Sequence, residues 1–214
     1  MMSDILIQAA LILISVIMYL AMHNIPQKAL AKFREYRGRA GAEAKRQFVL
    51  GAQILAQARS PSNSRSRTIS LAKQAEEAAI KAISLDPKDA AAHILKALSL
   101  DLQGFKSSAL DSLDVALSPL AVKSLSEREK GDALFKRAEL VMGMNKKEKR
   151  VESAIEDLKE AVELSKENAN AFRLLGECYE VKEMSEEAKF AYQEALRLNP
   201  DLGLAKDALQ RLGV

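Results

Sequence analysis

Small apolar residues occur along this chain at helical spacing and also at one longer interval. Ala82 and Ala116 lie 34 positions apart, and Ala161 and Ala195 repeat that interval. A fixed period of 34 residues in a helix-rich pattern predicts helical hairpins that stack into an array. Two further pairs of alanines share the interval: Ala75 with Ala109, and Ala154 with Ala188.

The N-terminal part of the chain has a different pattern. Residues 5–22 carry no charge, and Gln8 and Ser15 are the only polar side chains among them. A helix of that length spans about 27 Å, which is close to the thickness of a thin bilayer. A cleaved signal peptide is the alternative, but the acidic Asp4 and the lack of a good cleavage site disfavour it. We therefore predict a single transmembrane helix within residues 1–23.

A basic segment, residues 24–40, follows the apolar run. The positive-inside rule keeps such a flank in the cytosol, so the rest of the chain is expected to be cytosolic. The short anchor favours the endoplasmic reticulum, while a mitochondrial or plastid outer membrane would also accept it. The segment is amphipathic, and it either lies on anionic lipid or packs on the first hairpin as a cap. The candidate lipid contacts are Lys28, Lys32, Arg34, Arg37 and Arg39.

The last hairpin carries the most complete motif of the chain. Small residues at Gly176 and Ala188 allow two helices to approach closely, and Tyr179 and Tyr192 fill the space around them. The motif resembles the tetratricopeptide repeat (TPR), whose pattern of aromatic, Leu, Gly and Tyr is followed by Ala, an aromatic, Ala and Pro. The matching residues are Phe172, Leu175, Gly176, Tyr179, Ala188, Tyr192, Ala195 and Pro200.

The resemblance implies an all-α fold: an α-solenoid of about four TPR-like hairpins with a C-terminal capping helix, preceded by the transmembrane helix. Seven residues beyond the period lie around 117–124, and four more lie within 143–150. Ser126 and Glu129 have capping-box spacing and mark a helix start. Residues 60–68 are predicted to form a flexible connection. The expected units are 41–89 (divergent), 90–123, 124–168 (with an insertion), 169–202 and a capping helix over 203–214.

In this family the first helix of each unit lines a concave groove that holds a protein or peptide partner. Transferring the family's register gives a groove that is apolar at its N-terminal end and acidic at the other. The alternative is that the groove is filled internally, by the 26–40 helix or by tight superhelical closure. The candidate groove residues are Phe48, Leu55, Ile94, Leu98, Leu102, Phe135, Glu139, Arg173 and Glu177.

Some relatives grip the acidic tail of a chaperone with Lys, Arg and Asn side chains in this groove. The matching positions here do not build that clamp, so a chaperone tail is disfavoured. Nucleic acid is not expected, because no aromatic platform accompanies the basic residues. Counted from the first unit, the clamp positions are Phe48, Ala52, Leu95, Asp132 and Lys136. Counted from the second unit, they are Ile94, Leu98, Lys136, Asn170 and Leu174.

Composition points away from catalysis. The chain has 214 residues, a net charge of +3, one cysteine (Cys178), no tryptophan and two histidines, His23 and His93. We find no catalytic arrangement, no phosphate loop and no metal spacing, and we expect no cofactor. The sequence thus predicts a non-catalytic scaffold on the cytosolic face of a membrane. The alternatives are a receptor for apolar targeting segments, or a subunit of a membrane enzyme complex.

Overall fold

The computed structural model describes residues 25–144 and 148–213, with side chains described for 38–144 and 150–213. These residues form nine α-helices and one short 3₁₀ helix, and no strand occurs among them. The helices are α2 (Ile25–Ala58), α3 (Arg65–Leu85), α4 (Ala90–Gln103), α5 (Lys106–Ala116), η1 (Val122–Ser124), α6 (Glu127–Met144), α7 (Glu148–Leu164), α8 (Ala169–Val181), α9 (Ser185–Leu198) and α10 (Gly203–Arg211).

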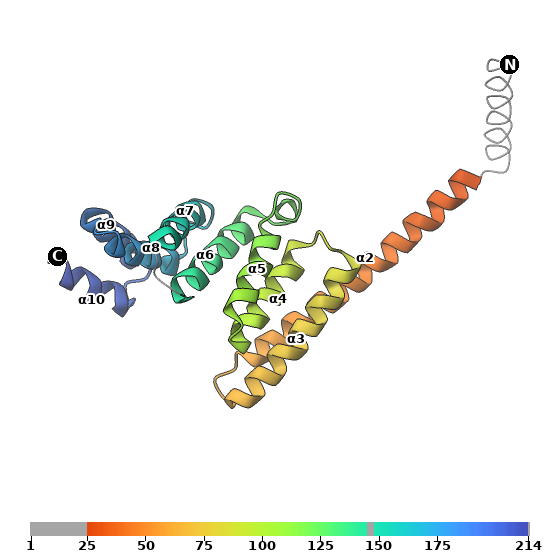
Figure 1. Ribbon diagram of the computed structural model, residues 1–214, viewed down its shortest axis with the longest axis horizontal. Coiled ribbons are helices and arrows are strands. Elements are labelled where there is room, and N and C mark those ends of the chain that lie inside the picture. Colours follow the sequence, from red (N-terminus) through yellow and green to blue (C-terminus); the bar gives the residue numbers. More distant parts are fainter. Residues whose placement is uncertain (1–24, 145–147, 214) are drawn as a thin grey trace, which may run out of the picture.

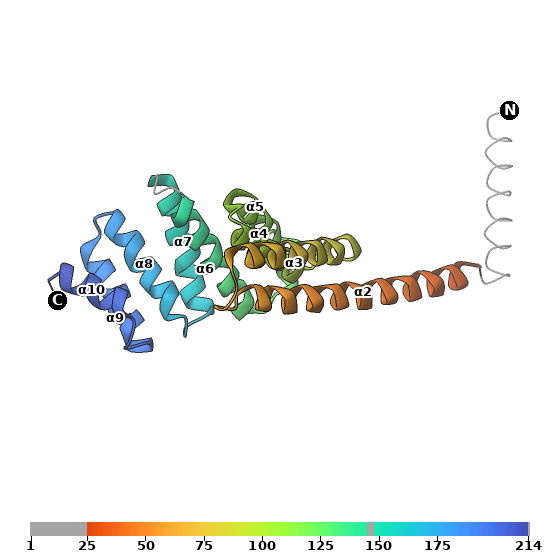
Figure 2. The same cartoon turned by 90° about the horizontal axis from the view of Figure 1, so that it is seen from below.

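Successive helices pair as hairpins and the hairpins stack into a solenoid that α10 ends (Figures 1 and 2). The alanines of the 34-residue period lie on the second helix of each hairpin, and every one of them is fully buried. A methyl group at these positions lets neighbouring helices pack closely without a void. The eight residues are Ala75, Ala82, Ala109, Ala116, Ala154, Ala161, Ala188 and Ala195.

The predicted transmembrane helix requires a correction. Within residues 25–144 and 148–213, none of the helices combines the length and the apolar character that crossing a bilayer needs. The longest helix, α2, has 34 residues, but its Lys, Arg and Glu side chains make it too polar. The fold class that placed such a helix ahead of the solenoid was therefore wrong, and the fold is an all-helical, TPR-like solenoid. The apolar run 5–22 lies outside the described residues.

Helix α2 is continuous through the boundary that the sequence places between residues 40 and 41. Its C-terminal half packs beside α3, whereas its N-terminal half extends away from the other helices (Figures 1 and 2). The interpretation of residues 26–40 as a cap on the first hairpin, or as a filling of the groove, does not hold. The extension leaves the concave side of the first hairpin open.

Polar side chains fix several helix starts. Ser126 and Glu129 form the reciprocal capping box that their spacing predicts: the Ser126 amide donates to the Glu129 carboxylate at 2.8 Å, and the Glu129 amide to the Ser126 hydroxyl at 3.3 Å. These hydrogen bonds hold the pKa of Glu129 below its usual value. Ser64 caps α3 by accepting from the Arg67 amide at 3.3 Å. Helix α3 thus begins at Arg65, inside the connection that was predicted to be flexible.

The extra residues after α5 occupy the joint between the second and third hairpins. Ala121 packs with Ala90 and Ala116, and the Ser124 hydroxyl accepts a hydrogen bond from the Ala90 amide at 3.0 Å. The insertion is therefore attached to the start of α4. It separates α5 from α6 by a compact turn instead of a direct connection.

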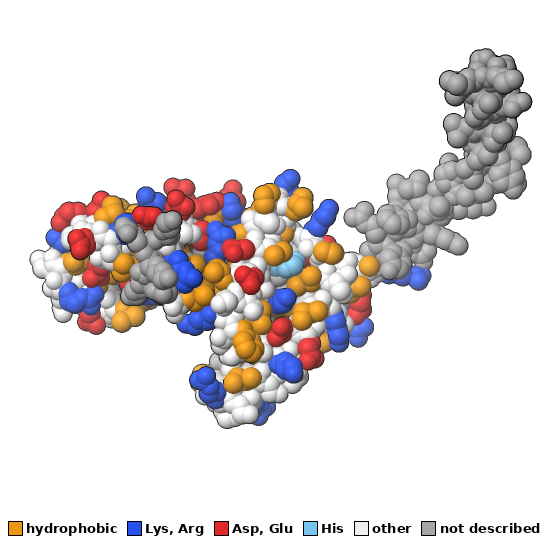
Figure 3. All heavy atoms as spheres, in the orientation of Figure 1, with side chains coloured by type: hydrophobic (Ala, Val, Ile, Leu, Met, Phe, Trp, Pro, Cys, Tyr) orange, Lys and Arg blue, Asp and Glu red, His pale blue; other side chains and the backbone are white. Residues whose placement is uncertain are grey.

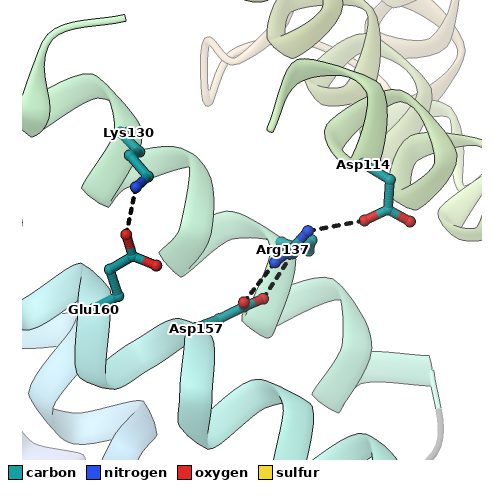
Figure 4. Close-up of polar contacts among 5 residues, drawn as sticks. All are labelled: Asp114, Lys130, Arg137, Asp157 and Glu160. Carbon is teal, nitrogen blue, oxygen red and sulfur yellow. Dashed lines mark hydrogen bonds and ion pairs between the residues drawn. The ribbon is translucent and has the colours of Figure 1, made fainter. Parts of the chain in front are cut away.

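Ion pairs of α6 hold the third hairpin together, and one of them, between Arg137 and Asp114, crosses the same joint (Figure 4). The Arg137 guanidinium on α6 donates to both carboxylate oxygens of Asp157 on α7, at 2.7 and 2.6 Å, and to Asp114 on α5 at 3.1 Å. A second pair joins Lys130 on α6 to Glu160 on α7. Arg137 thus connects three helices that belong to two different hairpins.

Candidate partner-binding groove

A cavity of about 490 Å³ opens on the concave side, between the first helices of three successive hairpins. We call it the apolar groove. Five of the nine groove residues predicted from the sequence line it: Phe48, Leu55, Ile94, Leu98 and Phe135. The remaining lining residues are Ala52, Ala56, Arg59, Ala91, Leu95, Leu125, Glu129, Asp132, Ala133 and Lys136.

Helical periodicity explains which side chains reach the groove. On α2 the lining positions 48, 52 and 55 lie three or four residues apart, so they share one face, and Arg59 follows directly after the end of the helix. Positions 91, 94, 95 and 98 on α4 have the same spacing. Gly51 borders this face of α2 and contacts α3 and α4: a Cβ added there would lie 2.8 Å from Leu95 and 3.2 Å from the Ala75 carbonyl oxygen. Glycine therefore permits the close approach that forms the floor of the groove.

The floor of the groove is a packed apolar cluster. Leu55 and Leu95 are buried within it, at 5% and 4% exposure. Phe48, Ala52 and Leu98 pack on this cluster and remain half-buried, so part of each side chain stays available on the concave side. Leu102, another predicted groove residue, packs on the same cluster but does not line the cavity.

Lys136 is the cation on the α6 wall of the groove. Its ammonium group lies 2.8 Å from an oxygen of Asp101 on α4 and 2.7 Å from one of Glu139 on its own helix. Burial lowers the pKa of Lys136, but the hydrogen bonds to these two carboxylates outweigh that effect and raise it above the ordinary value. Lys136 is therefore charged at neutral pH and already paired. Glu139, a predicted groove residue, acts here as its partner and is exposed.

The clamp positions counted from the first unit all line the apolar groove, whereas Asn170 and Leu174, from the count that starts one unit later, do not line it. The structure thus brings together the residues that the register aligns, but most of these side chains are not the Lys, Arg and Asn side chains that a clamp needs. One cation, Lys136, stands among them, and it is paired with Asp101 and Glu139. The five positions are Phe48, Ala52, Leu95, Asp132 and Lys136.

Arg173 and Glu177, the last two predicted groove residues, lie elsewhere. They form an ion pair at 3.3 Å and line a second cavity, of about 400 Å³, between α8, α9 and α10. In the same cavity the Tyr192 hydroxyl donates to Glu180 at 2.5 Å, and Arg211 pairs with Glu180 at 3.2 Å. Burial and the bond to Glu180 raise the pKa of Tyr192 far above its ordinary value. This polar end is separate from the apolar groove.

The sequence did not identify every wall of the groove. Leu125 and Glu129 line it because the inserted turn after α5 ends against α4. Arg59 closes the end of the groove where α2 terminates. Helical spacing could have identified Glu129, because it lies three positions before Asp132 and therefore on the same face of α6. Leu125 has no comparable signal, because it precedes α6.

A third cavity, of about 590 Å³, adjoins the groove at the start of α6. Asp132 lines both cavities, so the two are neighbours across the first turns of α6. We call this cavity the acidic cleft. It is lined by the carboxylates of Glu127, Asp132, Glu163 and Glu167, by the cations Arg128 and Lys166, and by Leu164, Ser165 and Asn168. Figure 3 shows acidic side chains along one edge of the C-terminal half, with cations among them.

The candidate lipid contacts all lie on the N-terminal half of α2. Arg39 is exposed. For Lys28, Lys32, Arg34 and Arg37 the backbone is helical, and their side chains lie outside the described part. Lipid binding by this helix stays a prediction.

The remaining reactive residues have packing roles. Cys178 is fully buried in the core of the C-terminal half. A His93 ring nitrogen lies 3.0 Å from the Pro87 carbonyl oxygen. Among the described residues, no group of three or more His, Cys, Asp or Glu side chains has the arrangement of a metal site.

Residues 169–202 match the family description "Tetratricopeptide repeat". Solved structures share the fold. A chain of the APC/C hetero-tetramer Cut9-Hcn1 has a TM-score of 0.63 at 19% identity, over 79% of this chain and 29% of that chain. Pseudomonas aeruginosa pilF has a TM-score of 0.61 at 22% identity, over 81% of this chain and 68% of that chain. The first TPR of Spaghetti (RPAP3), bound to HSP90 peptide SRMEEVD, has a TM-score of 0.50 at 22% identity, over 60% of this chain and 93% of that chain. No curated protein matches significantly.

Proposed function

We propose that this protein is a non-catalytic scaffold that binds an apolar segment of a partner protein in the apolar groove. The observation that carries the proposal is the lining of the groove. Phe48, Ile94, Leu98 and Phe135 stand on three different helices, face one cavity and remain partly exposed. Burial of large apolar side chains against such a surface is the main source of affinity when a helix or peptide docks in a groove.

The TPR-like fold supports a binding role. One solved TPR domain with the same fold holds an HSP90 peptide whose sequence, SRMEEVD, is acidic. An acidic peptide would find little attraction in this groove, because Lys136 is already paired with Asp101 and Glu139, and the carboxylates of Glu129 and Asp132 line the groove beside the remaining cation, Arg59. The chemistry of the lining instead favours an apolar ligand.

The size of the cavity is compatible with a few side chains. Pockets for compact ligands have volumes of roughly 300–1,000 Å³, and the groove, at about 490 Å³, lies within that range. Complete burial of each Leu, Ile or Phe side chain contributes about 1.5–3 kcal/mol. Two or three such anchors contribute about 3–9 kcal/mol, and the cost of association offsets about 4 kcal/mol or more of it, so these anchors alone give a weak complex with a Kd of about 0.2 mM at best.

The test is a binding measurement with fluorescent peptides rich in Leu, Ile and Phe. The variants Leu98→Asp and Phe135→Asp place a charge on the wall of the groove, so each should weaken binding at least about tenfold. Phe190→Asp is the matched control, since Phe190 lies on α9 and is already 63% exposed. Circular dichroism establishes that each variant is folded. Unchanged affinity in both groove variants would refute the proposal.

A further inference from the structure

We infer that the partner segment carries lysine or arginine residues beside its apolar stretch, and that these residues lie in the acidic cleft while the apolar stretch occupies the apolar groove. The inference rests on the proposed function and specifies the chemical class of the ligand. Two observations carry it: the two cavities are neighbours, and carboxylates outnumber cations in the acidic cleft but not in the apolar groove.

Asp132 connects the two cavities. It stands on the second turn of α6, where it lines the apolar groove on one side and the acidic cleft on the other. It is exposed, and the Ser165 hydroxyl donates to it at 3.3 Å. A peptide that leaves the groove past Asp132 therefore enters the acidic cleft directly.

The charges around this path favour a cationic ligand. The start of α6 carries Glu127, Glu129 and Asp132, the last turn of α7 carries Glu163, and the connection from α7 to α8 carries Glu167. Arg128 and Lys166 also line the cleft, so carboxylates outnumber cations there by two. A surplus of carboxylates in a concave site attracts Lys and Arg side chains and repels Asp and Glu.

The apolar groove has no comparable surplus of carboxylates. Arg59 and Lys136 line it together with Glu129 and Asp132, and Lys136 is already paired with Asp101 and Glu139. The basic residues of a ligand should therefore prefer the acidic cleft to the apolar groove.

Helix geometry sets the spacing that the ligand needs. From Lys136 to Glu127 the path follows nine positions of α6, or about 14 Å along the helix axis. An extended peptide covers that distance with about four residues. Basic residues should thus begin within about four positions of the last apolar anchor.

The experiment compares three synthetic peptides that share a stretch of about six Leu, Ile and Phe residues followed by about four Lys, four Ser or four Glu. Each is also made in the reverse order, since a peptide can cross the groove in either direction. The Lys peptide should bind about tenfold more tightly than the Glu peptide in about 0.05 M salt. The difference should largely disappear in about 0.5 M salt, because ions screen exposed charges.

Variants of the cleft locate the effect. Glu163→Gln with Glu167→Gln should weaken binding of the Lys peptide about threefold to tenfold and leave the Ser peptide unchanged. Both residues are exposed, so neutralising them does not threaten the fold. The matched control is Glu186→Gln with Glu187→Gln, which removes two exposed carboxylates from the first turn of α9.

The outcomes separate this inference from the proposed function. Equal binding of the Lys and Glu peptides, with loss of both in Leu98→Asp, would overturn the inference and leave an apolar-binding scaffold intact. No binding of any of the peptides would contradict both. A Lys preference that persists in the cleft variant and falls in the α9 control would also overturn the location proposed here.

Discussion

The two carboxylates that pair with Arg137 should differ greatly in their contribution to stability. Asp157 accepts two hydrogen bonds from Arg137 and its side chain is 8% exposed. Asp114 accepts one hydrogen bond and its side chain is 56% exposed. The perturbation is the replacement of each carboxylate by alanine, in Asp157→Ala and Asp114→Ala. The cation is the same in both, so burial is the main variable.

The magnitudes follow from that difference in burial. Removing one partner of a buried ion pair costs about 3–5 kcal/mol, because the other charge stays desolvated. Arg137 is 25% exposed and keeps Asp114, so we expect the lower end of that range for Asp157→Ala, about 3 kcal/mol. An exposed pair contributes about 0–1 kcal/mol, which is the loss expected for Asp114→Ala. For a chain of this size, the Tm should fall by about 6–12 °C in the first variant and by less than about 4 °C in the second.

The assay is urea and thermal unfolding followed by circular dichroism at neutral pH. A double variant, Arg137→Met with Asp157→Leu, serves as the internal control. It removes both charges, and apolar replacements of similar volume for a buried pair are commonly neutral or stabilising. It should therefore regain most of the free energy of unfolding that Asp157→Ala loses. Equal losses in the two single variants, or no recovery in the double variant, would refute the reasoning.

Three further predictions concern single positions. Gly51→Ala should lower the free energy of unfolding by about 1–3 kcal/mol relative to Gly41→Ala, measured by urea unfolding: both gain helix propensity, but only Gly51 has close neighbours within 4 Å. Ser126→Ala should cost about 1 kcal/mol at neutral pH. Because the folded state lowers the pKa of Glu129, its stabilisation is present above about pH 4.3 and is lost as the pH falls through the lowered pKa, so the difference from wild type should narrow in acid. Tyr192 has a raised pKa, so the folded protein should lose stability above about pH 10, and Tyr192→Phe should show a shallower loss in alkaline unfolding curves.

Local signals in the sequence were sufficient for the hairpins. The motif at 172–200 matches the tetratricopeptide repeat, and the capping box at Ser126 forms as its spacing predicts. The transmembrane helix was predicted from the apolar run 5–22. That run lies outside the described residues, and none of the described helices is apolar enough to cross a membrane. The start of α3 was also missed, because Ser64 caps the helix inside a run of serines and arginines that has the composition of a loop.

The groove was predicted in part, for a physical reason. The register placed Phe48, Leu98 and Phe135 on the concave side, since the position of a residue on a helix face follows from its spacing along the chain. The same register extended the groove to Arg173 and Glu177, which instead line a separate cavity. Whether the faces of successive helices form one groove depends on how the hairpins pack at the joint. The placement of the chain at a membrane and its lipid contacts stay predictions.

The sequence by itself determined the repeat and its close packing. Alanine at the period of 34 encodes where helices touch, because only a small side chain fits there, and all eight of these alanines are fully buried. The tertiary structure alone decided that the turn after α5 anchors to Ala90, that Arg137 joins three helices, and that Asp132 lies between an apolar groove and an acidic cleft. These contacts join residues far apart in the chain. Helix crossing angles and the inserted turn set them, and neither leaves a periodic signal in the sequence.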